Sequence, residues 1–151
     1  MKSRRELLTA ASTGLIMTTG CLGDSSSPVI RAVDADIERP TEIPTHINPT
    51  VIEHPKRGLV EIVGAETDTL ACPEFDWDVS PVNVDTTEVT VETTVVNNEP
   101  CTDDEIQVEM FPYRISVWFE DIVVGGKLRI KTSKQEEVHS LTGVEGGVTH
   151  I

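Results

Sequence analysis

The chain has 151 residues, with 26 acidic and 12 basic side chains and a formal net charge of −14 at pH 7. A surface this acidic repels nucleic acid and anionic lipid head groups, so the composition excludes a nucleic-acid-binding role. The length corresponds to one domain, which is large enough to bury a substantial apolar core.

The first 23 residues have the three parts of an export signal. Lys2, Arg4 and Arg5 form a basic head. Leu7 to Met17 is a mainly apolar run of 11 residues, and small side chains precede Cys21. The run is shorter than the ~20 apolar residues that a membrane span needs. It also lacks the charged face of an ordinary amphipathic N-terminal helix, which is the alternative interpretation.

Two short motifs in this segment indicate how the chain is exported and where it is anchored. Ser3 to Leu8 (SRRELL) resembles the twin-arginine signal S-R-R-x-F-L, with Leu7 at the usual Phe position. Thr18 to Cys21 (TTGC) resembles a lipobox, in which the cysteine becomes the lipidated first residue. In this order the two motifs resemble the exported lipoproteins of halophilic archaea. The resemblance covers only the first 23 residues, and it implies export of a folded chain and anchorage to the outer face of the cell membrane.

We therefore expect a signal peptide over residues 1–20, a lipidated Cys21 with a flexible tether over 21–28, and one domain over 29–151. Removing the signal takes away three basic residues and one acid, which leaves 9 basic and 25 acidic residues and a net charge of −16. Self-repulsion of this size opposes folding in dilute buffer, whereas molar salt shortens the Debye length to ~3 Å. Adaptation to high salt is the interpretation that fits the signal, and simple solubility is the alternative.

The domain sequence consists of short strand-like segments separated by turns rich in proline and glycine. Strands are expected over residues 29–38, 58–66, 86–96 and 113–124, with a short edge strand at 51–54. The alternation is clearest in residues 86–96, where the side chains of Val89, Val91, Thr93 and Val95 share one face. Pro112 is expected to interrupt the chain before the last of these strands.

Gly125-Gly126 predicts a β-hairpin, in which Val123 faces Leu128 and Glu120 faces Lys131. Asp121 then falls opposite Ile130 on the apolar face, and a bulge would turn it outward. The segment from Ser133 to Glu136 fits the capping box of one short helix. No repeat and no long helical periodicity is present in the sequence. The sequence therefore predicts an all-β fold, an immunoglobulin-like antiparallel β-sandwich of roughly six to eight strands.

Cys72 and Cys101 remain as an even pair if Cys21 takes the lipid. An oxidising exterior favours a disulfide between them. The two cysteines are 29 residues apart, and the chain-entropy model assigns such a loop ~3.6 kcal/mol. Two free, buried thiols are the alternative.

Metal sites and cofactors are not expected. A blue-copper site clusters its Cys, one His and Met on one loop, but the first histidine after Cys101 is His139. His46, His54, His139 and His150 are scattered in the sequence, so we expect four solvent-exposed histidines and no zinc site. The chain also lacks a Gly-x-Ser-x-Gly motif and a glycine-rich phosphate loop.

The most distinctive stretch of the domain sequence is Leu70 to Ser80 (LACPEFDWDVS). An extended conformation puts Phe75 and Trp77 on one face and Asp76 and Asp78 on the other. Aromatic rings beside acids could grip a sugar or a cationic ligand, and filling the core is the alternative. A disulfide would bring Asp103 and Asp104 to the same end, so these six side chains form the predicted ligand or cation patch. Hydration of an acidic surface is the alternative use of these acids.

The sequence predicts a lipid-anchored exterior domain with a non-enzymatic binding or envelope-structural role, and with a protein or carbohydrate partner at the cell surface. The alternative is an enzyme accessory subunit or a small hydrolase that uses surface carboxylates. A pocket lined by convergent acids or histidines would favour the enzyme. A filled sandwich with one exposed apolar patch would favour the binder.

Overall fold

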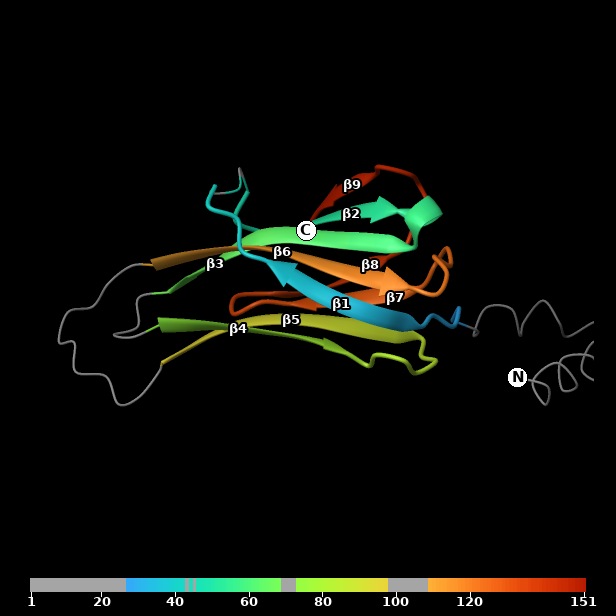
Figure 1. The fold of residues 1–151 in the computed structure, drawn as a ribbon, viewed down its shortest axis with the longest axis horizontal. Coiled ribbons are helices and arrows are strands. Elements are labelled where there is room, and N and C mark those ends of the chain that lie inside the picture. Colours follow the sequence, from blue (N-terminus) through green and yellow to red (C-terminus); the bar gives the residue numbers. More distant parts are fainter. Residues whose placement is uncertain (1–26, 43, 45, 69–72, 98–108) are drawn as a thin grey trace, which may run out of the picture.

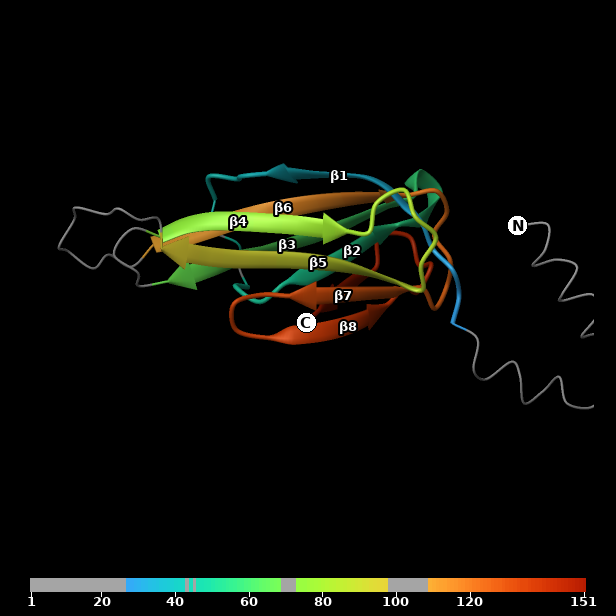
Figure 2. The same cartoon turned by 90° about the horizontal axis from the view of Figure 1, so that it is seen from below.

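A computed structural model describes residues 27–42, 44, 46–68, 73–97 and 109–151. Within these residues the chain forms nine strands and a single 3-10 turn, η2 (Pro55–Arg57). The strands lie in two sheets that face each other (Figure 1), and the view from below shows the second sheet in front of the first (Figure 2). The β-sandwich that the sequence predicts is therefore confirmed.

The first sheet has five antiparallel strands in the order β1-β6-β3-β2-β9. Their bounds are Ala32–Glu38 for β1, Glu109–Phe119 for β6, Leu59–Asp68 for β3, Thr50–His54 for β2 and Val148–His150 for β9. The predicted strand at 51–54 is present as β2. It is not an edge strand, because β9 pairs with the side of β2 that faces away from β3.

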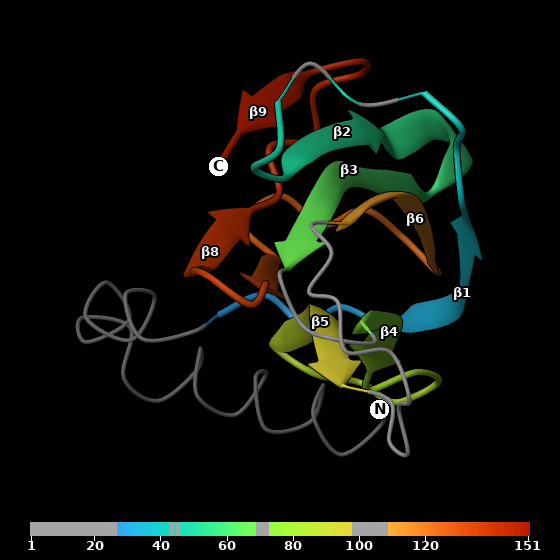
Figure 3. The same cartoon turned by 90° about the vertical axis from the view of Figure 1, so that its left-hand side faces the viewer.

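The second sheet has four strands in the order β4-β5-β7-β8. Their bounds are Pro73–Ser80 for β4, Glu88–Asn97 for β5, Lys127–Lys131 for β7 and Glu136–Ser140 for β8. β5 and β7 run parallel, and the other two pairs are antiparallel. The sandwich thus has one parallel pair and one strand more than the sequence predicts. Figure 3, an end-on view, shows β4 and β5 below the first sheet.

The hairpin predicted at Gly125-Gly126 does not form. β6 ends at Phe119, and β7 pairs with β5 and β8, so the two segments lie in different sheets. Residues 120–126 cross between the sheets instead, and a Cβ on Gly126 would lie 2.5 Å from Cγ2 of Ile30. Close packing of this crossover therefore explains the glycine. Asp121 lies exposed on the crossover, where no bulge is needed.

The alternation predicted for residues 127–131 is correct. Leu128 and Ile130 are buried in the core, whereas Lys127, Arg129 and Lys131 remain partly exposed. The predicted helix at Ser133–Glu136 is wrong, because these residues form the turn between β7 and β8 and the start of β8. The Thr132 N–H donates to the Gln135 carbonyl at 2.8 Å, and this bond closes the turn.

Pro112 lies inside β6 rather than before a new strand. It faces Ala65 of β3, whose N–H donates to the Ile47 carbonyl at 3.1 Å. On its other side β1 has already ended at Glu38, opposite Arg114. Neither neighbouring strand therefore needs a backbone N–H from residue 112. A proline, which has no N–H, is for this reason tolerated inside the strand.

The core lies between the sheets and is built from inward-facing residues of both. Its members with no exposed surface include Val60, Ile62, Ile115, Val117, Val89 and Leu128. The face of β5 that the sequence predicts to be buried is buried at Val89, Val91 and Thr93. Two hydroxyls enter this core, those of Thr93 and Tyr113, and neither has a hydrogen-bond partner among the described residues.

Strands β1 and β4 lie at sheet edges, and aspartates on both accept backbone hydrogen bonds. In each case the carboxylate takes the N–H of the next residue: Asp34 from Ala35 at 2.9 Å, Asp36 from Ile37 at 2.8 Å and Asp76 from Trp77 at 2.9 Å. An N–H that donates to a side chain is not free to pair with a passing strand. We call these three residues the aspartate edge caps.

Candidate functional site

An open cleft lies where the approach to β2, the end of β9 and the β7–β8 turn meet. Its volume is about 670 Å³, within the range of small-molecule sites, and it is lined by His46, Ile47, Asn48, Lys134, His150 and Ile151. A smaller hollow of about 260 Å³ shares His46 and is lined also by Pro44, Thr50, Ile52, Val63 and Arg114. We call the two together the histidine cleft.

Backbone contacts hold the segment before β2 against the sheet. The Ala65 N–H donates to the Ile47 carbonyl at 3.1 Å, and the Ile151 N–H donates to the Pro49 carbonyl at 2.9 Å. Gly64 makes this approach feasible, because a Cβ there would lie 3.1 Å from the Ile47 oxygen and 2.7 Å from the Tyr113 hydroxyl. A glycine in β3 therefore sets the wall of the cleft.

Two imidazole rings meet in the cleft. Antiparallel pairing of β2 with β9 places His150 directly opposite Thr50, and His150 Nδ1 lies 3.0 Å from Thr50 Oγ1. The His46 ring packs beside the His150 ring, with 4.7 Å between the ring centroids and 58° between the ring planes. The contact with Thr50 occupies Nδ1 of His150, so a ligand would meet Nε2.

The β7–β8 turn carries Lys134 into the cleft and is fastened to β3. The buried Glu66 carboxylate accepts the Ser133 N–H at 3.2 Å and also the Ser133 hydroxyl. Lys134 Nζ donates to Thr67 Oγ1 at 2.6 Å. The position of the lysine ammonium is therefore set by two adjacent residues of one strand.

Arg114 supplies a second cation on the other side of the cleft. Its Nη1 lies 2.6 Å from Glu61 Oε2, while His54 Nε2 lies 2.8 Å from Glu61 Oε1. Burial alone would raise the pKa of Glu61, but the hydrogen bonds from Arg114 and His54 outweigh it and hold that pKa below its usual value. Glu61 therefore neutralises part of the charge of Arg114 and fixes its orientation.

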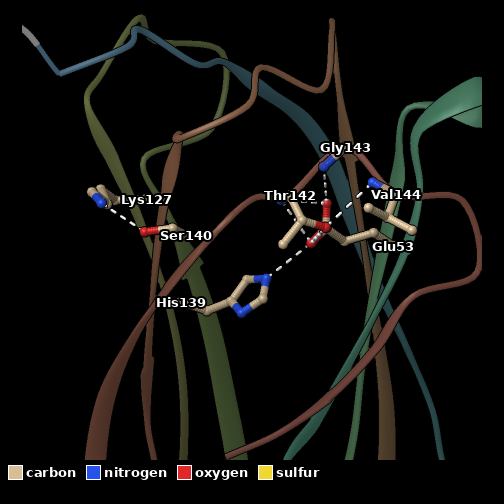
Figure 4. Close-up of polar contacts among 7 residues, drawn as sticks. All are labelled: Glu53, Lys127, His139, Ser140, Thr142, Gly143 and Val144. Carbon is tan, nitrogen blue, oxygen red and sulfur yellow. Dashed lines mark hydrogen bonds and ion pairs between the residues drawn. The ribbon is translucent and has the colours of Figure 1, made fainter.

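A buried carboxylate supports β2 from the interior (Figure 4). Glu53 is only 2% exposed and accepts four hydrogen bonds. The donors are His139 Nε2 at 3.0 Å, Thr142 N at 3.0 Å, Thr142 Oγ1 at 2.9 Å and Gly143 N at 3.0 Å. Burial alone would raise the pKa of Glu53, but these hydrogen bonds outweigh it and lower that pKa. The network ties β2 of the first sheet to β8 of the second.

The chemistry of the cleft favours recognition over catalysis. Its polar groups are the ammonium of Lys134, the guanidinium of Arg114, two imidazoles, the amide of Asn48 and the hydroxyl of Thr50, and its remaining surface is aliphatic. The Thr50–His150 contact has the reach of a nucleophile and its base, but a working pair also needs a third group that orients the base. The group beside the base is a second imidazole. In the part of the chain that the structure describes, no three His, Cys, Asp or Glu side chains lie close enough to hold a metal ion.

The predicted aromatic patch has the predicted alternation, and both of its rings pack against the core. Phe75 and Trp77 are half-buried against the core, and Asp76 and Asp78 are exposed. The Phe75 ring stacks on Tyr113, with centroids 5.7 Å apart, and the Arg39 guanidinium lies 4.5 Å from the Phe75 centroid. The protein's own side chains thus cover the Phe75 ring. This arrangement favours the core-filling alternative over a grip on a sugar.

Several predicted residues lie outside the described residues and stay predictions. They are Arg4, Arg5, Cys21, Cys72, Cys101, Asp103 and Asp104. The expectation of four solvent-exposed histidines is wrong for His139, which is buried because Glu53 gives its ring a charged partner in the interior. The cleft itself was not predicted. His46 and His150 are 104 residues apart. The register of β2 with β9 places His150 beside Thr50, and the backbone contacts of Ile47 and Pro49 hold His46 next to it.

Comparison with known proteins adds no family to this description. The chain matches no family model, no curated protein and no solved structure. Among the described residues, no helix has the length and apolar character needed to cross a membrane.

Proposed function

We propose that the protein is a lipid-anchored, extracytoplasmic ligand-binding domain of a salt-adapted cell, and that the histidine cleft is its ligand site. The observation that carries the binding role is the cleft, a ligand-sized hollow with converging polar side chains on elements that are pinned to the sheet. Pinned elements keep a site in shape before its ligand arrives, which lowers the entropic cost of binding.

The proposed cellular location rests on the sequence. The observations are the twin-arginine motif at Arg4-Arg5, the lipobox at Cys21 and the net charge of −14. Seven residue steps separate Cys21 from Pro28, so a lipid on Cys21 would hold that end of the domain within ~25 Å of the membrane. The start of β1 and the β7–β8 turn lie at opposite ends of the sandwich (Figures 1 and 2). An anchored domain would therefore present the Lys134 side of the cleft away from the membrane.

The alternative of a hydrolase that uses surface carboxylates has less support. The aspartate edge caps are occupied by backbone N–H groups. Glu61 and Glu88 are bonded to Arg114 and Arg129, at 2.6 Å in both cases. A general acid or base needs a carboxyl that is free to exchange a proton with a substrate. These carboxylates instead hold the fold together.

The proposed location is tested by fractionating cells that express the full chain. Cys21→Ser is expected to move the protein from the membrane fraction to the exported soluble fraction, whereas Ser26→Ala, a matched change in the tether, leaves it in the membrane. Changing both Arg4 and Arg5 to Lys is expected to stop export. Membrane retention of the Cys21→Ser protein would refute the lipid anchor.

A further inference from the structure

We infer that the histidine cleft binds an organic anion, meaning a carboxylate or phosphate group on a small apolar body. This inference rests on the proposed binding function and specifies its ligand.

The charge of the cleft is opposite to that of the protein. The sequence has 26 acids against 12 basic residues, yet every charged side chain among the described lining residues is a cation. Lys134 lines the cleft, and Arg114 lines the adjoining hollow, where Glu61 neutralises part of its charge. A dissolved anion therefore meets less repulsion beside Lys134 than beside the acidic side chains that predominate in the protein.

The polar groups of the cleft are those that an anion needs. Lysine and arginine side chains donate hydrogen bonds and accept none, and each imidazole offers at least one N–H. The centroids of the His46 and His150 rings are 4.7 Å apart, so one group of two or three oxygens can lie against both. Where the Thr50 hydroxyl donates to Nδ1 of His150, Nε2 carries the hydrogen of that ring and can donate to the group. Lys134 Nζ uses one of its three hydrogens on Thr67, which leaves two for a ligand.

The rest of the cleft is aliphatic and suits an apolar body. Ile47 is 45% exposed, and it lines the cleft together with Ile151. Ile52 and Val63 line the connected hollow. A ligand whose apolar part covers Ile47 would add hydrophobic free energy to the polar contacts. Free phosphate alone would leave this surface in water.

A divalent transition metal is the main competitor for two imidazoles. Such an ion prefers several nitrogen, sulfur or carboxylate ligands at once. The lining residues offer no carboxylate side chain, and the described part of the chain has no group of three such ligands. The neighbouring ammonium of Lys134 would also repel a cation. The site is therefore better suited to an anion.

The test uses the full chain exported with Cys21→Ser, which is soluble if the anchor is lost, at a KCl concentration that keeps ionic strength constant. The probes are benzoate and phenyl phosphate, with benzamide as a neutral control of the same shape as benzoate. Histidine side-chain NMR signals report where each probe binds, and calorimetry gives its affinity. We expect both anions to shift the signals of His46 and His150, with benzamide at least about tenfold weaker than benzoate.

Lys134→Gln and His150→Gln are expected to weaken benzoate binding by about three- to tenfold each. Both residues are exposed, so neither change threatens the fold. Lys131→Gln is the matched control, because Lys131 belongs to the same hairpin but pairs with Glu92. It should leave the affinity unchanged.

Three results would overturn the inference. Equal binding of benzamide and benzoate in the cleft would leave the proposed binding function intact but would refute the preference for an anion. Shifts of His46 and His150 with Zn²⁺ but not with either anion would make the cleft a metal site. Anion binding that shifts only NMR signals other than those of His46 and His150 would show that the cleft is not the ligand site. This result would count against the proposed function as well.

Discussion

Glu53→Gln tests whether the buried carboxylate holds the two sheets together. Glutamine keeps the shape of the side chain but replaces one oxygen by an NH₂ group, which cannot accept. The wild-type carboxylate accepts from His139, from the N–H and hydroxyl of Thr142, and from Gly143, at 2.9–3.0 Å. At least one donor would then face another donor in a site that is 2% exposed.

The expected loss follows from the number of these bonds. A hydrogen bond to a charged group contributes roughly 1.5–3 kcal/mol and a neutral one roughly 0.5–1.5 kcal/mol. Weakening two or three bonds and leaving one buried donor unpaired gives a loss of about 3–4 kcal/mol. For a domain of this size that is a drop of about 10–15 °C in melting temperature.

The pH dependence gives a second, independent signature. The folded-state pKa of Glu53 lies below the ordinary value of 4.5, so its stabilising effect is complete above pH 4.5 and is lost as pH falls through the folded-state pKa. The difference between wild type and Glu53→Gln should therefore be constant near neutrality and narrow in acid.

Urea unfolding at constant high KCl, followed by the fluorescence of the two half-buried tryptophans, Trp77 and Trp118, measures this difference. Glu92→Gln is the control, because Glu92 forms an exposed pair with Lys131 at 3.8 Å, and it should change stability by less than ~1 kcal/mol. A Glu53→Gln protein within that same margin at pH 7, or a difference that stays constant into acid, would refute the reasoning.

The remaining predictions concern the core, the crossover, the cysteines and the charge. Burial raises the pKa of Tyr113, the single tyrosine of the chain, so absorbance titration should show no ionisation at pH 10 while the domain is folded, and stability should fall as the pH rises beyond that value. Tyr113→Phe should keep or raise stability by up to ~1 kcal/mol, since its hydroxyl has no partner among the described residues; a clear loss in urea unfolding would mean that the hydroxyl is paired. Gly126→Ala should destabilise by ~1–3 kcal/mol, because its Cβ would press on Ile30, and an unchanged midpoint would speak against a tight crossover. Mass spectrometry of the exported protein should find Cys72 bonded to Cys101, and two readily alkylated thiols would contradict this. The melting temperature should rise between ~0.1 and ~3 M KCl, and a flat profile would argue against salt adaptation.

The sequence predicted those parts of the fold that depend on alternation. Val89, Val91 and Thr93 face the core because every second residue of a strand shares one side. The same rule placed Leu128 and Ile130 inward even though their strand pairs with different partners than expected. Alternation identifies the buried face of a strand, but it carries no information about which strand lies beside it.

The errors have a common physical origin in long-range contacts. Gly125-Gly126 has the local chemistry of a tight hairpin, but the space it needs is set by Ile30, which lies almost 100 residues earlier in the chain. Ser133 to Glu136 has the residues of a capping box, but Glu66 of another strand takes the Ser133 N–H and hydroxyl. In both places tertiary contacts outweigh a local preference that is worth only about 1 kcal/mol.

The candidate site could not be predicted for the same reason. His46 comes from an irregular segment, Lys134 from a turn and His150 from a three-residue strand. None of these segments has a motif, and each residue type is common on protein surfaces. The prediction of an aromatic ligand patch rests on the alternation of Phe75 and Trp77 with acids. Any strand with one buried face has that pattern, so it does not distinguish a ligand site from the core.

The aspartate edge caps have a consequence for how the sheet edges behave in concentrated salt. Many proteins keep their sheet edges apart by like charge, a force that acts over the Debye length and shrinks to ~3 Å in molar salt. A hydrogen bond of 2.8–2.9 Å from a carboxylate to its neighbouring N–H is made by contact and does not depend on that range. Edge-to-edge pairing of two copies through β1 or β4 would therefore be opposed at these three positions as much in concentrated salt as in dilute buffer.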